Sequence, residues 1–185
     1  TDRAQAHRVS RAEFERYRDE REHDGARYEL LDGEILVTPA PIPLHQRAVL
    51  RLARRLPQTH EDHELFTAPL DVVLPVADTD SVLQPDLLLV RRQDITEKVI
   101  EGVPLLVVEV LSPTTWRRDL GPKRDTYAAA GVEHYWVVAP TVPSLTVYGL
   151  GADDVYEETM HVEGGQVARI TEPVTLELRP SDLAS

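Results

Sequence analysis

The run Leu105-Leu106-Val107-Val108-Glu109-Val110-Leu111 decides the fold of this chain, because it is aliphatic almost throughout. Near-continuous aliphatic runs are typical of strands that are covered on both faces of a sheet. Glu109 is the exception, and a lone buried carboxylate is costly unless it has a partner cation or a metal ion. Two explanations stay open for Glu109 alone: a functional acid, or a structural ion pair or exposed strand end.

Outward from this run, hydrophobic periodicity predicts alternating strands and helices. Ser10 and Glu13 form a capping-box pattern that opens a helix running to near Glu22. Asp32 and Gly33 predict the turn of a hairpin. The expected strands are residues 28–31, 34–38, 65–74 (irregular at Pro69), 84–90, 104–111, 133–139 and 144–150, and the expected helices are 10–22, 44–56 and 117–130. This order predicts one α/β domain over residues 1–185, with a mixed central sheet flanked by helices and residues 151–185 as an added antiparallel hairpin.

The composition narrows the class of protein. The chain has 185 residues, 42% of them hydrophobic, no cysteine and a net charge of −12. No apolar run approaches the roughly 20 residues of a membrane helix, so we expect a cytoplasmic protein without membrane contact. The absence of cysteine excludes disulfides and thiolate metal sites. The acidity counts against a protein that coats nucleic acid non-specifically, because phosphate affinity comes from Lys and Arg.

Asp86 is a second acid at an aliphatic run, since Pro85 precedes it and Leu87-Leu88-Leu89-Val90 follows it. Two neighbouring strands that each carry one acid can place both carboxylates on one divalent cation. Mg²⁺ prefers oxygen ligands of this kind, and such a cation can activate a water and stabilise charge on phosphorus. Alone, the Pro-Asp pair is better explained as a turn that caps a strand. Together with Glu109, it predicts a metal site.

Lys123 is the third element of this pattern. The chain has 18 arginines but only two lysines, Lys98 and Lys123. A lysine retained in an arginine-rich chain indicates a need for a compact ammonium that can contact a water or a phosphate. Asp119, Lys123 and Tyr127 are spaced i, i+4, i+8 and therefore share one face of the predicted helix. The alternative is an ordinary solvated Asp–Lys helix pair.

Arginines supply candidate contacts to a phosphate backbone. Arg47 and Arg51 lie on the basic face of the predicted helix 44–56, together with Arg54 and Arg55, and Arg117 stands at the start of the predicted helix 117–130. Such a stripe suits nucleic acid. A solvated face that pairs with nearby acids is the simpler explanation of the same pattern.

Taken in order, several segments resemble those of the PD-(D/E)xK nuclease superfamily, and most closely its Uma-type restriction endonuclease family. They span roughly residues 10–150 and are Tyr28-Glu29-Leu30-Leu31-Asp32-Gly33-Glu34, the proline-rich stretch leading to His45, Pro85-Asp86, Val108-Glu109-Val110-Leu111-Ser112-Pro113-Thr114, Asp119-x3-Lys123-x3-Tyr127 and Gly131-Val132-Glu133-His134-Tyr135-Trp136. One position departs from the superfamily pattern. Its lysine is expected two residues after the second acid, where this chain has Leu111, and Lys123 would take its place from the following helix.

The resemblance implies a restriction-endonuclease-like core with the site at one edge of the sheet. Mg²⁺ or Mn²⁺ would be held by Asp86, Glu109 and the backbone carbonyl of Val110, with Glu29 as an additional acid. Lys123 would orient or deprotonate the attacking water, or bind the adjacent phosphate. The supporting residues would be Asp119 and Tyr127, which position Lys123, and His45 near the site.

The function implied is that of a metal-dependent endonuclease that hydrolyses phosphodiester bonds in DNA, with RNA left open as a substrate and a homodimer as a further expectation. Two alternatives stay open. The net acidity favours a catalytically silent member of the fold that binds nucleic acid or protein. The other alternative is metal-dependent hydrolysis of a smaller phosphoester.

Overall fold

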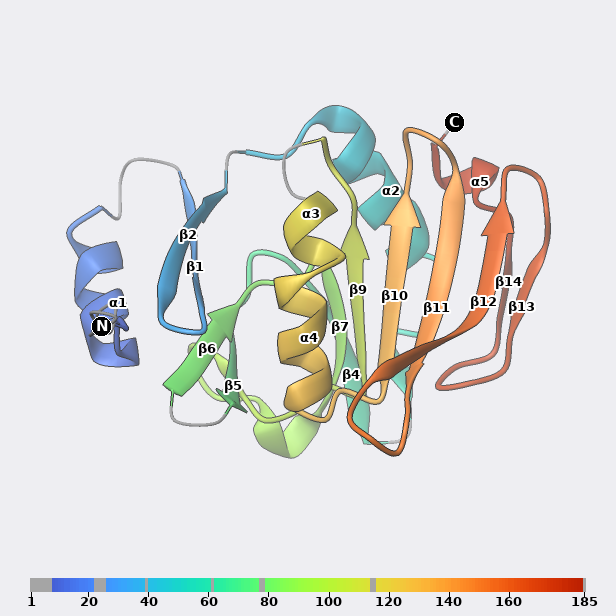
Figure 1. Cartoon of the computed structure of the whole chain (residues 1–185). Coiled ribbons are helices and arrows are strands. Elements are labelled where there is room, and N and C mark those ends of the chain that lie inside the picture. The colour runs from blue at the N-terminus through green and yellow to red at the C-terminus, as the bar shows by residue number, and fades with distance from the viewer. Residues whose placement is uncertain are drawn as a thin grey trace, which may run out of the picture.

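A mixed sheet of seven strands forms the centre of the computed structural model, which describes residues 8–21, 26–38, 40–60, 62–76, 79–113 and 116–184 (Figure 1). Its strands in spatial order are β12 (Tyr156–Glu163), β11 (Ser144–Leu150), β10 (His134–Ala139), β9 (Leu106–Val110), β7 (Leu87–Arg91), β4 (His63–Thr67) and β3 (Thr59–His60). Strand β9 pairs parallel with β10 and antiparallel with β7. The predicted mixed sheet is therefore confirmed.

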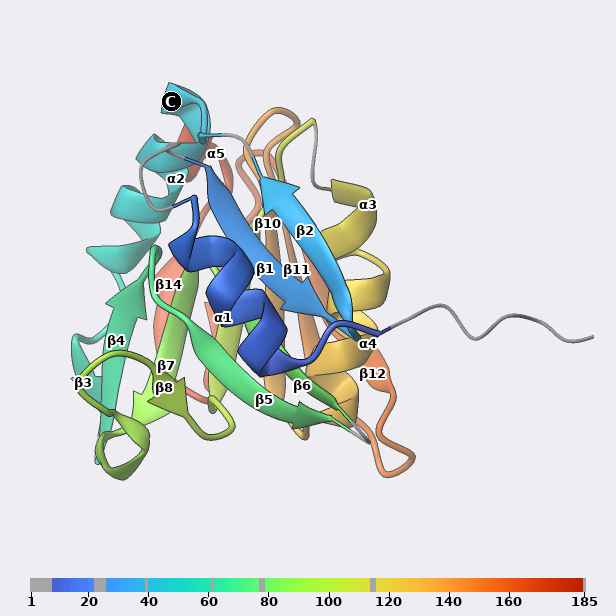
Figure 2. The same ribbon diagram turned by 90° about the vertical axis from the view of Figure 1, so that its left-hand side faces the viewer.

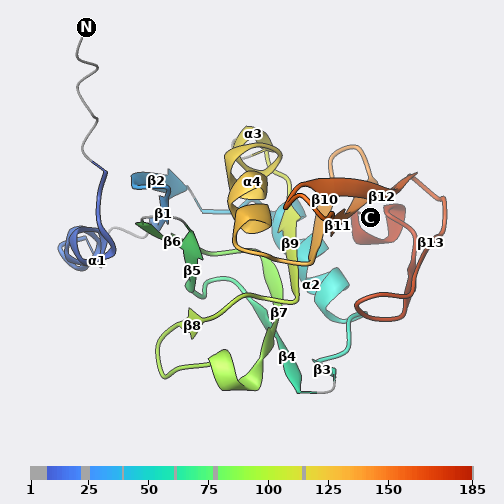
Figure 3. The same cartoon turned by 60° about the horizontal axis from the view of Figure 1, so that its bottom comes forward.

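Strand β9 is buried on both faces, as its aliphatic sequence predicts. Val108 and Val110 join the core beneath helix α2 (Pro43–Ala53), whereas Val107 joins the core beneath helix α4 (Pro122–Ala129). Figure 3 shows these two helices on opposite sides of the sheet. Because successive strand residues point to opposite faces, Glu109 lies on the α4 face together with Val107.

A second sheet of five strands lies beside the first (Figure 1). Its order is β2 (Glu34–Thr38), β1 (Arg27–Leu31), β6 (Thr79–Leu83), β5 (Val72–Val76) and β8 (Ile100–Glu101), and the 3₁₀ helix η1 (Arg92–Asp94) precedes β8 in the chain. The hairpin of β1 and β2 is confirmed, because Asp32 and Gly33 have φ values of 49° and 79°. Positive φ at both central residues is the conformation that a tight hairpin turn requires.

The expectation of one strand over residues 65–74 is wrong. This segment contains most of β4 and the beginning of β5, which belong to different sheets. Pro69 lies between them, and proline has no N–H to donate to a strand ladder. The sequence prediction also missed β6, which pairs with β5 and through Val82 with Leu30 of β1.

Helix α1 (Arg11–Asp19) has the predicted capping box, in which the Ser10 side chain and the Glu13 carboxylate each accept from the other's backbone N–H. Figure 2 shows α1 lying across the five-stranded sheet, where Phe14 packs with Tyr28 and Leu30. The expected end of this helix near Glu22 lies outside the described residues. Helix α2 ends at Ala53, three residues before the predicted end.

The predicted helix 117–130 is two helices, α3 (Trp116–Asp119) and α4, so the expectation of one continuous helix is wrong. Pro122 begins α4, where its missing N–H costs no intrahelical hydrogen bond. Gly121 before it has a non-helical backbone, with φ −126° and ψ −107°. Gly131 follows the helix with a φ of 85°, which confirms the predicted stop.

The C-terminal residues extend the structure at one edge. Strand β12 adds to the central sheet, β13 (Ala168–Ile170) and β14 (Leu176–Leu178) form a separate hairpin, and helix α5 (Ser181–Ala184) packs beside α2. That residues 1–185 form one domain stays a prediction. Within the described ranges, no helix has both the length and the apolar character needed to cross a membrane.

Candidate active site

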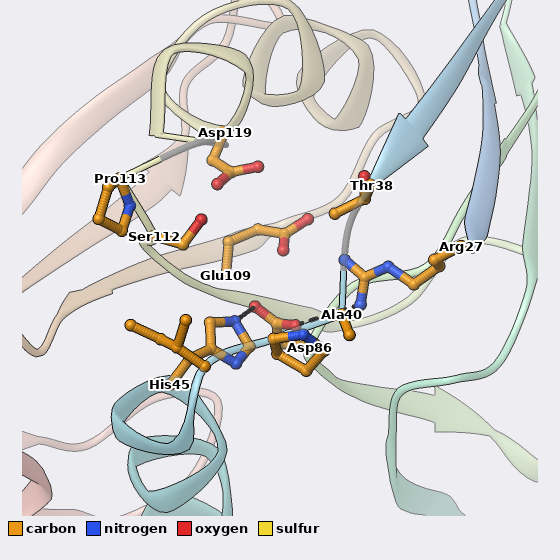
Figure 4. A pocket seen from close by; sticks show the side chains of 11 residues that line it. Arg27, Thr38, Ala40, His45, Asp86, Glu109, Ser112, Pro113 and Asp119 are labelled. Carbon is orange, nitrogen blue, oxygen red and sulfur yellow. Dashed lines mark hydrogen bonds and ion pairs between the residues drawn. The ribbon is translucent and has the colours of Figure 1, made fainter. Parts of the chain in front are cut away.

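A cavity of about 380 Å³ lies where β9 ends and β7 begins, between the central sheet, β1 and the first turn of α2. Figure 4 shows the side chains of Glu109, Asp119 and Asp86 gathered around it. The residues that line it are Arg27, Thr38, Ala40, Pro41, Ile42, His45, Asp86, Glu109, Ser112, Pro113 and Asp119. Three carboxylates therefore border one cavity, and they come from three separate parts of the chain.

The register of the central sheet brings the two predicted acids together. Leu87 of β7 is opposite Val108 of β9 in an antiparallel ladder. Asp86 directly precedes Leu87 and Glu109 directly follows Val108, so the two acids lie at the same end of this ladder. Both line the same cavity. Like charges that are held close together repel each other, and a cation that contacts both acids would offset this repulsion.

Asp86 is buried, with 3% of its surface exposed, and its carboxylate has three partners. The backbone N–H of Val110 donates to Oδ2 at 2.8 Å, and His45 Nε2 lies 3.0 Å from the same oxygen. Arg27 Nη1 lies 3.6 Å from Oδ1. Burial alone would raise the pKa of Asp86, but the contacts with His45, Val110 and Arg27 outweigh it and hold this pKa below its usual range. Asp86 is therefore ionised at neutral pH.

Glu109 is held by two donors from helix α4. Lys123 Nζ lies 3.1 Å and the Tyr127 hydroxyl 3.0 Å from Glu109 Oε1. Burial raises the pKa of Glu109 to about 8, and the charges of Asp119, Asp86 and Glu29 add to this shift while Lys123 opposes it. The metal-free site thus keeps Glu109 largely protonated at pH 7, and both contacts use Oε1 rather than Oε2.

Lys123 is buried among three carboxylates. Its ammonium nitrogen lies 2.9 Å from Glu29 Oε1, 3.1 Å from Glu109 Oε1 and 3.9 Å from Asp119 Oδ1. Burial would lower the pKa of Lys123, but the charges of Glu109, Glu29 and Asp119 outweigh it and raise this pKa above its ordinary value. A permanently charged ammonium has no lone pair, so the expected role of deprotonating water does not fit Lys123. A fixed positive charge that offsets the surrounding acids does fit, and it reaches the cavity through Glu109, which lines it.

Glu29 and the helix residues take more specific places than the sequence predicted. Glu29 is buried on β1, and its Oε1 accepts the backbone N–H of Gln84 at 2.7 Å. Asp119 is on α3 rather than on one helix with Lys123, although its carboxylate lies near the ammonium. The Tyr127 hydroxyl donates to Glu109 Oε1, the oxygen that Lys123 also contacts, so its role in positioning Lys123 stays a prediction.

Arg27 is the site residue that sequence reasoning missed. It is on β1 two residues before Glu29, and alternate strand residues share a face. This two-residue spacing from Glu29 was the signal in the sequence that could have identified Arg27 as a site residue. Its guanidinium reaches toward Asp86 in Figure 4. Its Nε is buried without a hydrogen-bond partner, as is Nδ1 of His45 on the other side of Asp86.

The donor chemistry of the cavity fits a hard divalent cation. Among the residues that the structure describes, no three His, Asp or Glu side chains form by themselves a group that could hold a metal ion. Mg²⁺, however, commonly takes one or two carboxylates and fills its other positions with water, which matches Asp86 and Glu109 in one cavity. The N–H of Val110 points to Asp86, whereas that of Leu111 donates to Val138 of β10. The carbonyl of Val110 shares the side of its N–H and thus faces Asp86.

The predicted phosphate-binding arginines lie outside this cavity. Arg51 Nη1 donates to the backbone oxygen of Asp182 at 3.0 Å, which ties α2 to α5. The Arg117 guanidinium stacks over the exposed ring of Trp116, 4.9 Å from its centroid. Arg47 is exposed on α2. Their contact with nucleic acid stays a prediction.

The fold and this acid–acid–lysine arrangement define a protein of the restriction-endonuclease-like class. Residues 11–183 match the sequence profile of the Uma2 family, whose description is "Putative restriction endonuclease". Because the match spans nearly the whole chain, the chain belongs to the Uma2 family, and the resemblance inferred from its motifs is confirmed.

Known structures support the same fold. The chain is similar to the crystal structure of "a putative nuclease belonging to DUF820" from Anabaena variabilis ATCC 29413. The two share 19% sequence identity with a TM-score of 0.65, over 85% of this chain and 89% of that chain. At this identity the likeness shows the fold alone. No curated protein matches the chain.

Proposed function

We propose that this protein is a divalent-metal-dependent endonuclease that hydrolyses phosphodiester bonds in DNA. The observation that carries the proposal is that Asp86, just before β7, and Glu109 of the neighbouring strand β9 line one cavity. Mg²⁺ commonly binds through one or two carboxylates of this kind. Membership of the Uma2 family supports the nuclease chemistry.

Asp86, Glu109 and the carbonyl of Val110 are the proposed ligands of Mg²⁺ or Mn²⁺. A cation bound there supplies an activated water and neutralises the charge that builds on phosphorus. The chain's own groups prepare this site. His45 and the Val110 amide fix the Asp86 carboxylate, and the Tyr127 hydroxyl and Lys123 fix Oε1 of Glu109, which leaves Oε2 directed to a ligand.

Lys123 acts in this proposal as a fixed positive charge. Glu29 and Asp119 hold the ammonium against Glu109 and keep it protonated. Its charge offsets the acids around it and, through its contact with Glu109, would favour the negative charge of that carboxylate when a metal ion binds. Preorganised charges of this kind cost no rearrangement during the reaction, and removing one typically lowers turnover about 100-fold or more.

The test is cleavage of supercoiled plasmid DNA with Mg²⁺ or Mn²⁺. We expect the wild type to nick or linearise the plasmid, and Glu109→Gln and Asp86→Asn to lose at least about 100-fold of that rate. Glu177→Gln, an exposed acid on β14, is the matched control and should cleave like the wild type. Absence of cleavage on any DNA or RNA substrate, together with absence of calorimetric metal binding, would overturn the proposal.

A catalytically silent interaction module is the second candidate. The net charge of −12 favours it, as does the finding that the described residues form no ready-made metal cage. Its signature would be binding of nucleic acid or protein that needs no metal and that Lys123→Ala leaves unchanged. Loss of binding in that variant would argue against it.

Two further expectations complete the proposal. We expect residues 1–185 to unfold as one domain in a single cooperative transition, which calorimetry checks. We also expect a homodimer, which light scattering checks.

A further inference from the structure

A second cavity adjoins the candidate active site. It has a volume of about 530 Å³ and shares Arg27, Ala40 and Pro41 with the first cavity. The end of α1 and the beginning of β1 form most of its wall, and Figure 2 shows α1 lying across β1. The two cavities therefore adjoin at these three residues, and Arg27 at the junction lines both.

The two cavities differ in charge. The candidate active site is bordered by three carboxylates, those of Asp86, Glu109 and Asp119. The second cavity is bordered by the arginines 18, 21 and 27 and by one acid, Asp19. A basic surface directly beside an acidic one stands out in a chain with a net charge of −12. Phosphate groups bind through Lys and Arg, whereas a divalent cation binds through carboxylates.

Arg27 has donor capacity that its protein contacts leave unused. Its Nη1 lies 3.6 Å from Asp86 Oδ1, which is beyond a good hydrogen bond, and its Nε is buried without a partner. The side chain is 22% exposed, so its guanidinium is held in place yet reachable. The exposed part of this guanidinium is suited to contact with a phosphate.

Arg21 is a second arginine of this cavity that suits a phosphate. Its guanidinium lies over the Tyr17 ring, 3.8 Å from the ring centroid, and its Nη1 donates to the Tyr17 backbone oxygen at 2.9 Å. These contacts fix the position of the guanidinium while the side chain stays 37% exposed. A positioned and exposed guanidinium is suited to contact with a phosphate.

We propose that the second cavity binds the single nucleic-acid strand that continues from the scissile phosphodiester, with Arg27 on the phosphate at the junction and Arg21 on the next one. The inference rests on the proposed nuclease function and names the path of its substrate. The volume of the second cavity, about 530 Å³, is within the roughly 300–1,000 Å³ of pockets that hold one small molecule, which suits one or two nucleotides of a single strand rather than a duplex.

The test is the affinity of a fluorescently labelled single-stranded oligonucleotide, measured by anisotropy in EDTA over a range of salt concentrations. We expect Arg21→Gln and Arg27→Gln each to weaken binding about tenfold and to lower the salt dependence by about one phosphate contact. Arg169→Gln is the matched control, because Arg169 is an exposed arginine on β13 that pairs with Glu177. It should bind like the wild type.

The outcomes separate this inference from the proposed function. Because Arg27 is largely buried, the half-exposed Arg21 provides the variant whose folding is least at risk. Wild-type binding that both variants retain, or absence of wild-type binding, overturns the inference even where plasmid cleavage succeeds. Loss of binding in Arg21→Gln supports the inference even where no metal-dependent cleavage is seen, in which case the nuclease proposal alone fails.

Discussion

Replacing Lys123 with Met removes the positive charge from the centre of the acid cluster while keeping the length of the side chain. The ammonium lies within 3.1 Å of both Glu29 and Glu109 and is 3% exposed, so solvent cannot replace it. Removal of one partner of a buried ion pair costs about 3–5 kcal/mol. For a chain of this length, that corresponds to a fall in Tm of about 6–20 °C.

The assay is urea unfolding at pH 7 of the wild type, Lys123→Met and Lys98→Met. Lys98, the other lysine, is exposed, and its replacement should change the free energy of unfolding by no more than about 0.5 kcal/mol. We expect the Lys123→Met deficit to shrink at lower pH, because carboxylates that take up protons no longer need a counter-charge. If the free energies of unfolding of Lys123→Met and Lys98→Met at pH 7 lie within about 1 kcal/mol of each other, the reasoning is refuted.

Further outcomes follow from the same contacts. Burial raises the pKa of Glu109 in the folded protein from 4.5 to about 8. Its contribution to the free energy of unfolding is therefore fully present below pH 4.5 and is lost as the pH rises to about 8. Urea unfolding between these pH values should show this loss of stability in the wild type without metal and not in Glu109→Gln. Mg²⁺ binding near pH 7 should release about one proton from Glu109, and calorimetric heats that do not depend on the buffer would contradict this. His45→Ala should cost about 1.5–3 kcal/mol by removing the hydrogen bond to Asp86, and unchanged urea unfolding would argue against that bond. Ser10→Ala should cost about 1 kcal/mol through the lost capping box, and an unchanged Tm would contradict it.

The sequence predicted the parts of the fold that local chemistry determines. Strands β7, β9 and β10 follow from aliphatic runs, and the capping box of α1 and the Asp32–Gly33 turn follow from hydrogen bonding and φ preferences over a few residues. The anomaly of Glu109 inside such a run left two explanations open, and its combination with Asp86 and Lys123 predicted a site. These features can be predicted from the sequence because each depends on residues that are neighbours in the chain.

Features that depend on contacts between residues far apart in the chain could not be predicted in the same way. Whether residues 65–74 stay in one strand depends on which sheet each half joins, and the pairing of β5 with β6 decides that. The roles of Lys123 and Tyr127 depend on how many carboxylates surround them, which composition alone does not reveal. Arg27 becomes a site residue only because β1 lies beside the central sheet.

The acid cluster also explains how a chain this acidic can be suited to a phosphate-bearing substrate. Asp86 and Glu109 line one cavity, Arg21 lines the adjoining cavity, and Arg27 lines both. Local charge, rather than the net charge of −12, decides where a polyanion can approach.

A crystal structure of the protein soaked in Mn²⁺, with anomalous scattering recorded, tests the central claim most directly. We predict an anomalous peak in the cavity about 2.1 Å from a carboxylate oxygen of Asp86 and from one of Glu109, with Lys123 still paired with Glu29. An absence of any peak there, or a peak that touches neither carboxylate, would contradict the claim that these two acids share a metal ion.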